Sequence, residues 1–310
     1  MSRLGVVVFG AGIAGKVRIR DIGAVDFPER TWTLAGFVSR RDIEIEGACR
    51  LTEEEAFSRA DINAVVVCTE NNSHERIIRN ALKHGKHVLV EYPVATNALA
   101  TRELFELAEQ KGVILHEENI ALLTTGFQSM RDKLAAVSQP IVKGEIKLNG
   151  SYNGWVEDFM KSGGPFCVNV TLIQSVYELL GKTRLQATGG QLDVSDEEFT
   201  ATAELSCDIC RDLTLTVRRT KQRSPREKVM RFTLADGTVI EETPEKPAST
   251  PQGGAGPKKP GLFMEDFLQF VGKVQGTIDP SADMARTLHC IQVAADIHGL
   301  MGLAVERSSI

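Results

Sequence analysis

The sequence lacks a long apolar run, and this absence excludes several classes of protein. No apolar stretch in it approaches the ~20 residues that a helix needs to cross a membrane. The apolar run near the N-terminus, Leu4–Phe9, is also too short for the hydrophobic region of a secretory signal peptide. We therefore expect a cytoplasmic protein that has no membrane partner.

The sequence also lacks an excess of positive charge and an ordered set of cysteines. Its formal net charge is −5, which argues against nucleic acid as the main partner. Its six cysteines are scattered along the chain, as expected for buried thiols in a reducing compartment. Cys207 and Cys210 form a C-x-x-C pair with no second pair to complete a zinc site. We therefore expect no metal site.

The composition is that of a folded globular protein with room for two domains. The 310 residues are 42% hydrophobic and 25% charged. In the first third, strand-like runs alternate with amphipathic helical segments, which predicts a parallel sheet covered on both faces. The expected strands are Leu4–Phe9, Thr33–Val38, Val65–Cys68, His87–Val90 and Val113–His116. We expect this doubly wound α/β domain to span residues 1–122.

Local signals support the helices expected between these strands. Thr52 and Glu55 have the spacing of a capping box at a helix N-terminus. The segment 74–84 places its apolar residues on one helical face. The helix expected over 98–111 stops at Gly112, a usual C-terminal residue.

The pattern changes after residue 122, and we expect a second, α+β domain over residues 123–310. Its strand candidates follow one another without helices between them, which predicts a large, mostly antiparallel sheet. These strands are Lys143–Tyr152, Arg184–Leu192, Glu198–Cys207, Asp212–Arg219 and Lys228–Glu241, the last broken by a hairpin turn at Asp236 and Gly237. Helices are expected over 168–180, 263–275 and 282–303, and the Pro/Gly-rich segment 243–261 is expected to be a surface loop.

A glycine-rich turn follows the first expected strand and opens a helix, which is the setting of a dinucleotide-binding motif. The candidate cofactor-binding residues are Gly10, Ala11, Gly12, Ile13, Ala14 and Gly15. Gly10 would permit the tight turn, Gly12 the approach of a pyrophosphate, and Gly15 close packing of helix and strand. The helix N-terminus would supply amides to the phosphates. We therefore predict an NAD(P)-binding Rossmann domain.

The residues after the second expected strand indicate which dinucleotide is preferred. That strand runs into Ser39, Arg40 and Arg41, where NAD sites usually have an acid that binds the ribose. A hydroxyl and two guanidinium groups suit a 2′-phosphate instead. The alternative is a solvated turn with incidental arginines. We expect NADPH, with NADH also usable because its binding does not require the missing carboxylate.

The run 64–93, AVVVCTENNSHERIIRNALKHGKHVLVEYP, resembles a segment of the glucose–fructose oxidoreductase / inositol dehydrogenase family. Together with the Gly10 turn, the resemblance covers about the first 120 residues. It implies a Rossmann domain followed by a domain with an open-faced antiparallel sheet. It also implies that the turn Asn71, Asn72 and Ser73, with His74 at the following helix start, contacts the cofactor. The alternative for His74 is a plain helix N-terminal residue.

The sequence departs from the family pattern at the residues that remove a proton from a sugar hydroxyl. Where the family has the lysine of E-K-P, this sequence has Tyr92. Where the family has an aspartate and a histidine in a later motif, Asn169 and Ile173 align. A sugar dehydrogenase without these three groups has no evident general base.

The stretches 36–42, 73–93, 106–119 and 288–290, with Glu91-Tyr92-Pro93, resemble a branch of the family that reduces a linear tetrapyrrole. This resemblance implies NAD(P)H-dependent reduction of biliverdin to bilirubin, a step of heme catabolism, by hydride transfer to the central methine carbon. That reaction deprotonates no alcohol. Tyr92 can stack on the tetrapyrrole or the nicotinamide. Tyr92, Glu91 and Glu118 are the candidate catalytic residues.

A purely structural role remains an alternative for each of these residues. Tyr92 can simply fill the strand end, Glu91 can cap a turn, and Glu117 with Glu118 can form a solvated helix start. The basic stretch 218–228 is better explained as a solvated hairpin connection than as a site for propionates.

Two other functions also remain open. They are a sugar or cyclitol NADP-dependent dehydrogenase and a non-catalytic NADP-binding regulator. The expected assembly is a monomer or a weak homodimer formed through the open sheet.

Overall fold

The computed structural model describes residues 3–24, 30–152, 158–222, 226–242 and 260–303. These residues group into two units. The first contains the described parts of Met1–Ile120 and Pro260–Ala285, and the second those of Ala121–Lys259 and Arg286–Arg307. The expected boundary after residue 122 stays a prediction, and the return of Pro260–Ala285 to the first unit was not expected. Most of the Pro/Gly-rich segment, 243–259, lies outside the described residues.

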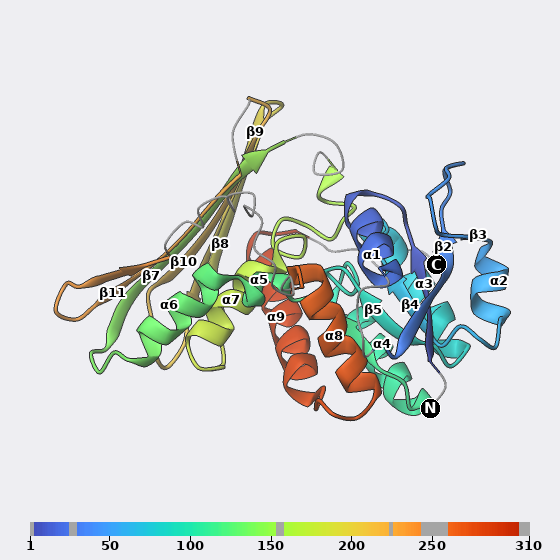
Figure 1. Ribbon diagram of the computed structural model, residues 1–310. Helices are drawn as coiled ribbons and strands as arrows, with labels where there is room; N and C mark the ends of the chain where they lie inside the picture. The colour runs from blue at the N-terminus through green and yellow to red at the C-terminus, as the bar shows by residue number, and fades with distance from the viewer. Residues whose placement is uncertain (1–2, 25–29, 153–157, 223–225, 243–259, 304–310) are drawn as a thin grey trace, which may run out of the picture. The chain divides into compact units, whose positions relative to one another are not determined.

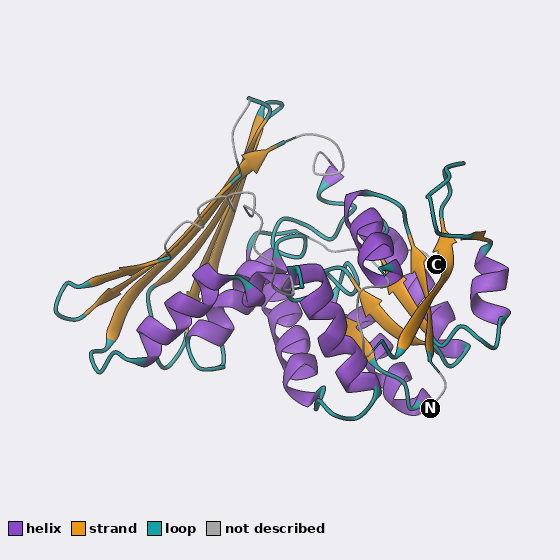
Figure 2. Ribbon diagram, in the orientation of Figure 1, coloured by secondary structure: helices purple, strands orange, loops and turns teal. Residues whose placement is uncertain are grey.

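The first unit is built on a six-stranded parallel sheet (Figures 1 and 2). Its strands are β1 (Leu4–Phe9), β2 (Trp32–Val38), β3 (Arg50–Leu51), β4 (Ala64–Val67), β5 (His87–Val90) and β6 (Leu115–Glu117). Their order in the sheet is β3-β2-β1-β4-β5-β6. Successive strands are added on one side of β1 up to β3 and on its other side from β4 onward, so the order switches between β1 and β4. The carboxyl ends of β1, β4 and β5 therefore lie at the edge where doubly wound folds bind ligands. The Rossmann prediction is confirmed.

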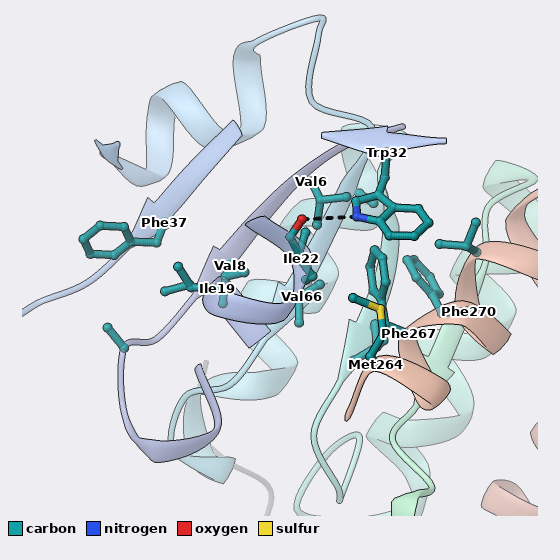
Figure 3. Close-up of a cluster of buried hydrophobic side chains, with 14 residues drawn as sticks. Val6, Val8, Ile19, Ile22, Trp32, Phe37, Val66, Met264, Phe267 and Phe270 are labelled. Carbon is teal, nitrogen blue, oxygen red and sulfur yellow. Dashed lines mark hydrogen bonds between the residues drawn. The ribbon is translucent and has the colours of Figure 1, made fainter. Parts of the chain in front are cut away.

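Helices pack on this sheet, and one of them comes from late in the sequence. The helices are α1 (Ile13–Gly23), α2 (Glu53–Ser58), α3 (Asn71–Lys83), α4 (Ala98–Lys111) and α8 (Leu262–Val274). Figure 3 shows side chains of α8 meeting those of α1, β1 and β2 in one apolar cluster. There Trp32 crosses Phe267 edge-on with ring centroids 5.3 Å apart, and its indole N–H donates to the carbonyl of Ile22 at 3.2 Å. Helix α8 therefore completes the core of the first unit.

The second unit is built on a mostly antiparallel six-stranded sheet (Figure 2). Its strands are β7 (Ile141–Ser151), β8 (Gln186–Val194), β9 (Glu198–Ser206), β10 (Leu213–Thr220), β11 (Glu227–Leu234) and β12 (Val239–Glu241), in the order β12-β11-β7-β10-β9-β8. Among its pairs, β7 and β10 run parallel. Along β9, Phe199 and Ala201 are buried while Thr200 and Thr202 are partly exposed, so one face is packed and the other open. The open-faced sheet is confirmed.

One helix, α6 (Thr125–Ala135), was not expected from the sequence. The remaining helices of the described residues are α5 (Ile120–Leu123), α6, α7 (Val170–Leu179) and α9 (Ser281–Leu300). No helix was expected between residue 122 and the helix at 168–180, so α6 corrects that expectation. Its signal was present, because Phe127, Met130 and Leu134 have helical spacing and are buried. The hydroxyl of Thr124 also caps it by accepting from the Phe127 amide.

Other local expectations hold. Thr52 and Glu55 form the capping box, and Gly112 ends α4 in the left-handed conformation. A turn at Asp236 and Gly237 joins β11 to β12, and the Asp236 carboxylate accepts from the Thr238 amide at 2.9 Å. None of the helices in the described ranges has the length and apolar character of a membrane-spanning segment.

Candidate active site at the carboxyl edge of the parallel sheet

The glycine-rich turn between β1 and α1 has one glycine that faces open space and two that cannot be replaced. A Cβ atom added at Gly12 would meet no atom within 4 Å. At Gly10 it would lie 2.4 Å from the Cys68 carbonyl oxygen, and at Gly15 2.0 Å from that of Gly10. No side chain caps α1, and no acidic residue lies in its first turn. The open space at Gly12 and these uncapped amides fit a dinucleotide pyrophosphate.

A pocket of about 520 Å³ opens after strands β2 and β3. Ser39, Arg40 and Arg50 are among its lining residues, together with the first turn of α2. Ser39 and Arg40 were expected here, whereas Arg50 was not. A guanidinium pair beside a hydroxyl is suited to a phosphate monoester such as the 2′-phosphate of NADP. Glu53 and Glu55 also line the pocket, and their carboxylates are held by Arg76 and by the Thr52 amide.

Arg40 and Arg41 have different partners. Arg40 pairs with Glu70 at 2.7 Å, and the side chains of this pair are 82% and 58% exposed. Arg41 donates to the carbonyl of Ala11 in the glycine-rich turn at 2.7 Å. Arg50 contacts Asp42 at 2.5 Å. These cations are solvated and are held by contacts that an incoming phosphate can replace.

The first turn of α3 lies at the end of β4, but its four expected cofactor residues are not equivalent. Asn71, Asn72 and Ser73 belong to the helix itself, which begins three residues earlier than expected. His74 is fully buried; its Nδ1 lies 2.8 Å from the Pro93 carbonyl and its Nε2 3.1 Å from the Thr69 carbonyl. Burial lowers the pKa of His74, which favours the neutral ring. His74 thus joins the turn after β4 to the turn after β5.

Tyr92 lies in a turn that is fixed on both sides. The Tyr92–Pro93 peptide bond is cis, and the carbonyl of Pro93 is the one that His74 contacts. The next amide, that of Val94, donates to the carboxylate of Glu117 at 3.1 Å. Tyr92 itself is half-buried at the carboxyl end of β5. The surrounding backbone is therefore anchored where a flat ligand would meet the tyrosine ring.

A buried group of charged side chains lies beneath this turn, and we call it the Arg18 cluster. The guanidinium of Arg18, on α1, contacts Glu91 at 3.1 Å and Asp266, on α8, at 2.7 Å. His116 donates its Nε2 hydrogen to Asp266 at 3.0 Å and accepts at Nδ1 from Lys273 at 2.7 Å. The members of the cluster are Arg18, Glu91, His116, Glu118, Asp266 and Lys273.

The cluster shifts the pKa values of its two glutamates upward. Burial raises the pKa of Glu91, and the nearby Arg18 only partly opposes this effect. Burial, followed by the charges of Glu91 and Asp266, raises the pKa of Glu118 well above its usual range. Burial also opposes ionisation of Asp266, but its contacts with His116 and Arg18 outweigh burial and lower its pKa. The arrangement favours a neutral carboxylic acid at Glu118.

Sequence reasoning found the two glutamates but missed the residues that control them. Arg18 belongs to a helix whose buried face also includes Ile19 and Ile22, and this is the signal that could have identified a buried cation. Asp266 is separated from Glu91 by more than half the chain, so no local pattern connects them. Arg50 was missed because β3, the two-residue strand that it begins, is too short to recognise.

Two residues of the second unit align with the family's base, and both have structural roles. The Asn169 side chain accepts from Arg219 at 3.0 Å and donates to the Pro165 carbonyl at 2.7 Å. Ile173 is a fully buried apolar side chain. In the basic stretch 218–228, Arg218 pairs with Glu198 at 2.7 Å, and residues 223–225 lie outside the described residues. A base for a sugar hydroxyl is thus missing from both aligned positions.

Comparison with known proteins places this geometry in a family. Residues 4–119 match the model of the oxidoreductase family with an NAD-binding Rossmann fold. Biliverdin reductase A from Mus musculus is 31% identical over 305 residues, covering 96% of each chain. The Homo sapiens enzyme is 31% identical over 302 residues and 95% of each chain. The chain belongs to the biliverdin reductase family. It is an NAD(P)-dependent oxidoreductase.

Solved structures confirm the fold of a biliverdin reductase over nearly the whole chain. Biliverdin reductase from Synechocystis sp. PCC 6803, in complex with biliverdin and NADP⁺, matches with a TM-score of 0.80 at 20% identity, covering 96% of this chain and 99% of that one. Apo scyllo-inositol dehydrogenase from Lactobacillus casei matches with a TM-score of 0.75 at 16% identity, covering 97% and 96%. The same architecture therefore serves relatives with different substrates.

Proposed function

We propose that this protein reduces biliverdin to bilirubin with NADPH, by hydride transfer to the central methine carbon. The observation that carries this proposal is the similarity to two biliverdin reductases A over at least 95% of the chain. A relative at this identity supports the reaction class, and the residues at the carboxyl edge support the choice of substrate.

NADPH is the proposed cofactor. The residues of the Gly10–Gly15 turn are proposed to hold its pyrophosphate, and Gly12 leaves space for it. Ser39, Arg40, Arg41 and the added Arg50 are proposed to hold the 2′-phosphate. Bound NADPH supplies the hydride. NADH remains usable, because its binding does not require the missing carboxylate after β2.

Tyr92 is proposed to stack on the reacting ring system, with Glu91 and Glu118 as the acidic groups beside it. The turn that carries Tyr92 is held by His74 and Glu117, so the ring has a fixed base from which to pack. Asn71, Asn72 and Ser73 are proposed to line the ribose and nicotinamide side. His74 is proposed to support this side from below, since its ring is fully buried.

A sugar or cyclitol dehydrogenase is less well supported by the same residues. Such an enzyme must take a proton from a hydroxyl as hydride leaves. Tyr92, Asn169 and Ile173 stand at the positions that align with the family's lysine, aspartate and histidine, and the Asn169 amide is already hydrogen-bonded on both sides. Reduction of a conjugated methine requires a proton donor and no such base.

The test is an absorbance assay with purified protein, NADPH and biliverdin. We expect the green pigment to become yellow as NADPH is oxidised. The matched control is Gly12→Val, because its Cβ faces open space and the variant should fold while its side chain fills the pyrophosphate site. NADPH binding by the wild type without turnover of biliverdin would reject the proposal and favour a non-catalytic NADP-binding regulator. Oxidation of inositol or glucose would instead favour a sugar dehydrogenase.

The assembly and the location also stay predictions. A monomer or a weak homodimer through the open face of β7–β11 is expected, and light scattering over a concentration series distinguishes them. Fractionation of the source cell tests the expected cytoplasmic location.

A further inference from the structure

The Arg18 cluster contains more buried carboxyl groups than neighbouring cations can neutralise. Glu91, which follows β5, and Asp266, from α8, both contact the same guanidinium, that of Arg18 from α1. Lys273 donates to His116, which contacts Asp266, and it also pairs with Asp283. Glu118, next to this group at the end of β6, has no cation in contact with it among the described side chains. One carboxyl group of the cluster should therefore keep its proton at neutral pH.

Hydrogen bonds identify Glu118 as the group that keeps the proton. Its backbone amide donates to the Val90 carbonyl at 2.8 Å, which places it beside Glu91 on the neighbouring strand. One of its carboxyl oxygens accepts from the Ile120 amide at 2.6 Å. The other oxygen, Oε2, is buried and has no hydrogen-bond partner. An ionised carboxylate in that state would be costly, whereas a neutral acid can hold its proton on Oε2.

We propose that Glu118 is the neutral carboxylic acid that supplies the proton in the reduction, and that Glu91 and Asp266 are positioning residues whose negative charges keep it neutral. This inference rests on the proposed bilin reduction. As hydride adds to the methine carbon, an electron pair moves through the conjugated system onto a pyrrole nitrogen. Glu118 Oε2–H gives its proton to that nitrogen, forming the N–H bond and leaving a carboxylate, which solvent reprotonates after turnover.

The positioning role follows from the partners that face Glu118. Glu91, which follows β5, and Asp266 from α8 are negative neighbours that disfavour a third charge. Arg18 from α1 holds both of these carboxyl groups and so favours their ionised forms. Its charge also acts to lower the pKa of Glu118, but burial and the two carboxylates outweigh it. The half-buried thiol of Cys68, which follows β4, lies 3.9 Å from Glu91. The proton thus stays on Glu118, whose Oε2 has no hydrogen-bond partner.

The first test measures the proton without any turnover. Infrared difference spectra of the cofactor-free protein at pH 7 should contain the carbonyl band of a neutral carboxylic acid. Glu118→Gln should remove this band, whereas Glu106→Gln, an exposed carboxylate on α4, should leave it in place. Circular dichroism verifies that each variant folds. A wild-type spectrum without the band, or a band that survives in Glu118→Gln, overturns the proposal.

The second test measures delivery of the proton. In steady-state assays with NADPH and biliverdin, Glu118→Gln should lower kcat by about 100-fold or more with little change in KM, because general acids contribute roughly 10²- to 10⁴-fold. Glu106→Gln should match the wild type. The wild-type kcat should fall as pH rises through the pKa of Glu118, and this alkaline limb should vanish in Glu118→Gln.

A third variant tests the charge of Glu91. Glu91→Gln removes a negative neighbour, so the alkaline limb should move to lower pH. An unmoved limb in Glu91→Gln, or wild-type turnover in Glu118→Gln, would overturn the proton-donor role while leaving the proposed function intact. Failure of the wild type itself to reduce biliverdin would reject the proposed function and the delivery role together, and the infrared band would then report only the charge state.

Discussion

The two ends of the carboxyl edge of the parallel sheet differ in how far their charged side chains are exposed to water. At the β2–β3 end, Arg40 and Glu70 form a pair whose side chains are 82% and 58% exposed. At the β5–β6 end, Arg18 and Asp266 form a pair whose side chains are 1% and 0% exposed. Exposed charges are screened by water and salt, whereas buried charges depend on each other for their ionisation. The first arrangement is suited to selecting a ligand and the second to fixing protonation states.

Removal of one partner from the buried pair should cause the largest effect that we expect, which is a loss of protein stability. Arg18→Met leaves Asp266 and Glu91 buried without their shared cation. We expect the free energy of unfolding to fall by about 3–5 kcal/mol, as for other buried pairs that lose one member. Urea denaturation followed by circular dichroism measures the loss.

The matched change at the exposed end is Arg40→Met. It should alter the free energy of unfolding far less, because Glu70 remains hydrated without its partner. Equal losses for the two variants would show that burial does not distinguish the two ends.

The next largest effect concerns Tyr92, which lies beside the buried end. Tyr92→Ala removes a stacking ring, and reacting carbons that drift from hydride-transfer distance can lower rates by ~100-fold. Tyr92→Phe keeps the ring and loses a hydroxyl whose hydrogen bond is worth on the order of 1 kcal/mol, so turnover should fall less than about tenfold. Turnover of biliverdin at saturating NADPH across pH 6 to 9 separates the cases. A Phe variant as inactive as the Ala variant would make the hydroxyl itself essential.

At the exposed end, we expect the loss of contacts with the cofactor phosphate to weaken NADPH binding. Changing Arg40 and Arg41 together to Ala should raise KM for NADPH by at least about tenfold, because charge-assisted hydrogen bonds to the phosphate are lost. KM for NADH should barely change. If both cofactors lose equally, the arginines support the fold and do not select the cofactor.

The smallest effect is that of salt. Raising ionic strength from ~0.05 to ~0.2 M should increase KM for NADPH a few-fold, since the arginines that meet its phosphate are solvated. KM for NADH and the pH of the alkaline limb should change less. A shift of that limb as large as the change in KM would indicate that water and ions reach the Arg18 cluster.

These differences also explain which parts of the molecule could be predicted from the sequence. Gly10, Gly12 and Gly15 are adjacent in the chain, and their backbone demands give a local pattern that can be recognised. Thr52 with Glu55 and the turn at Asp236 are local in the same sense. Apart from β3, the strands of the parallel sheet follow from short apolar runs, and those of the second sheet follow from hydrophobic alternation. Neither signal requires knowledge of distant partners.

The rest depends on contacts between distant residues. Arg18 and Asp266 are 248 positions apart, so nothing near either residue reveals the buried pair. The pKa of Glu118 depends on Glu91 and Asp266, which come from other elements. The roles of Tyr92, Glu91 and Glu118 stay predictions, although their places at the carboxyl edge are now described. Helix α6 was missed through misreading of a local pattern, and no distant contact explains that error.

The placement of α8 in the first unit has a consequence for synthesis of the protein. The Rossmann sheet is complete once residue 117 has been made, but Trp32 then lacks Phe267, and Arg18 lacks Asp266. A nascent chain with only its first 120 residues outside the ribosome has an open core, and its Arg18 has Glu91 as a partner but still lacks Asp266. The cofactor-binding half therefore finishes folding only after α8 emerges, so a premature stop upstream of α8 would disable both halves of the protein.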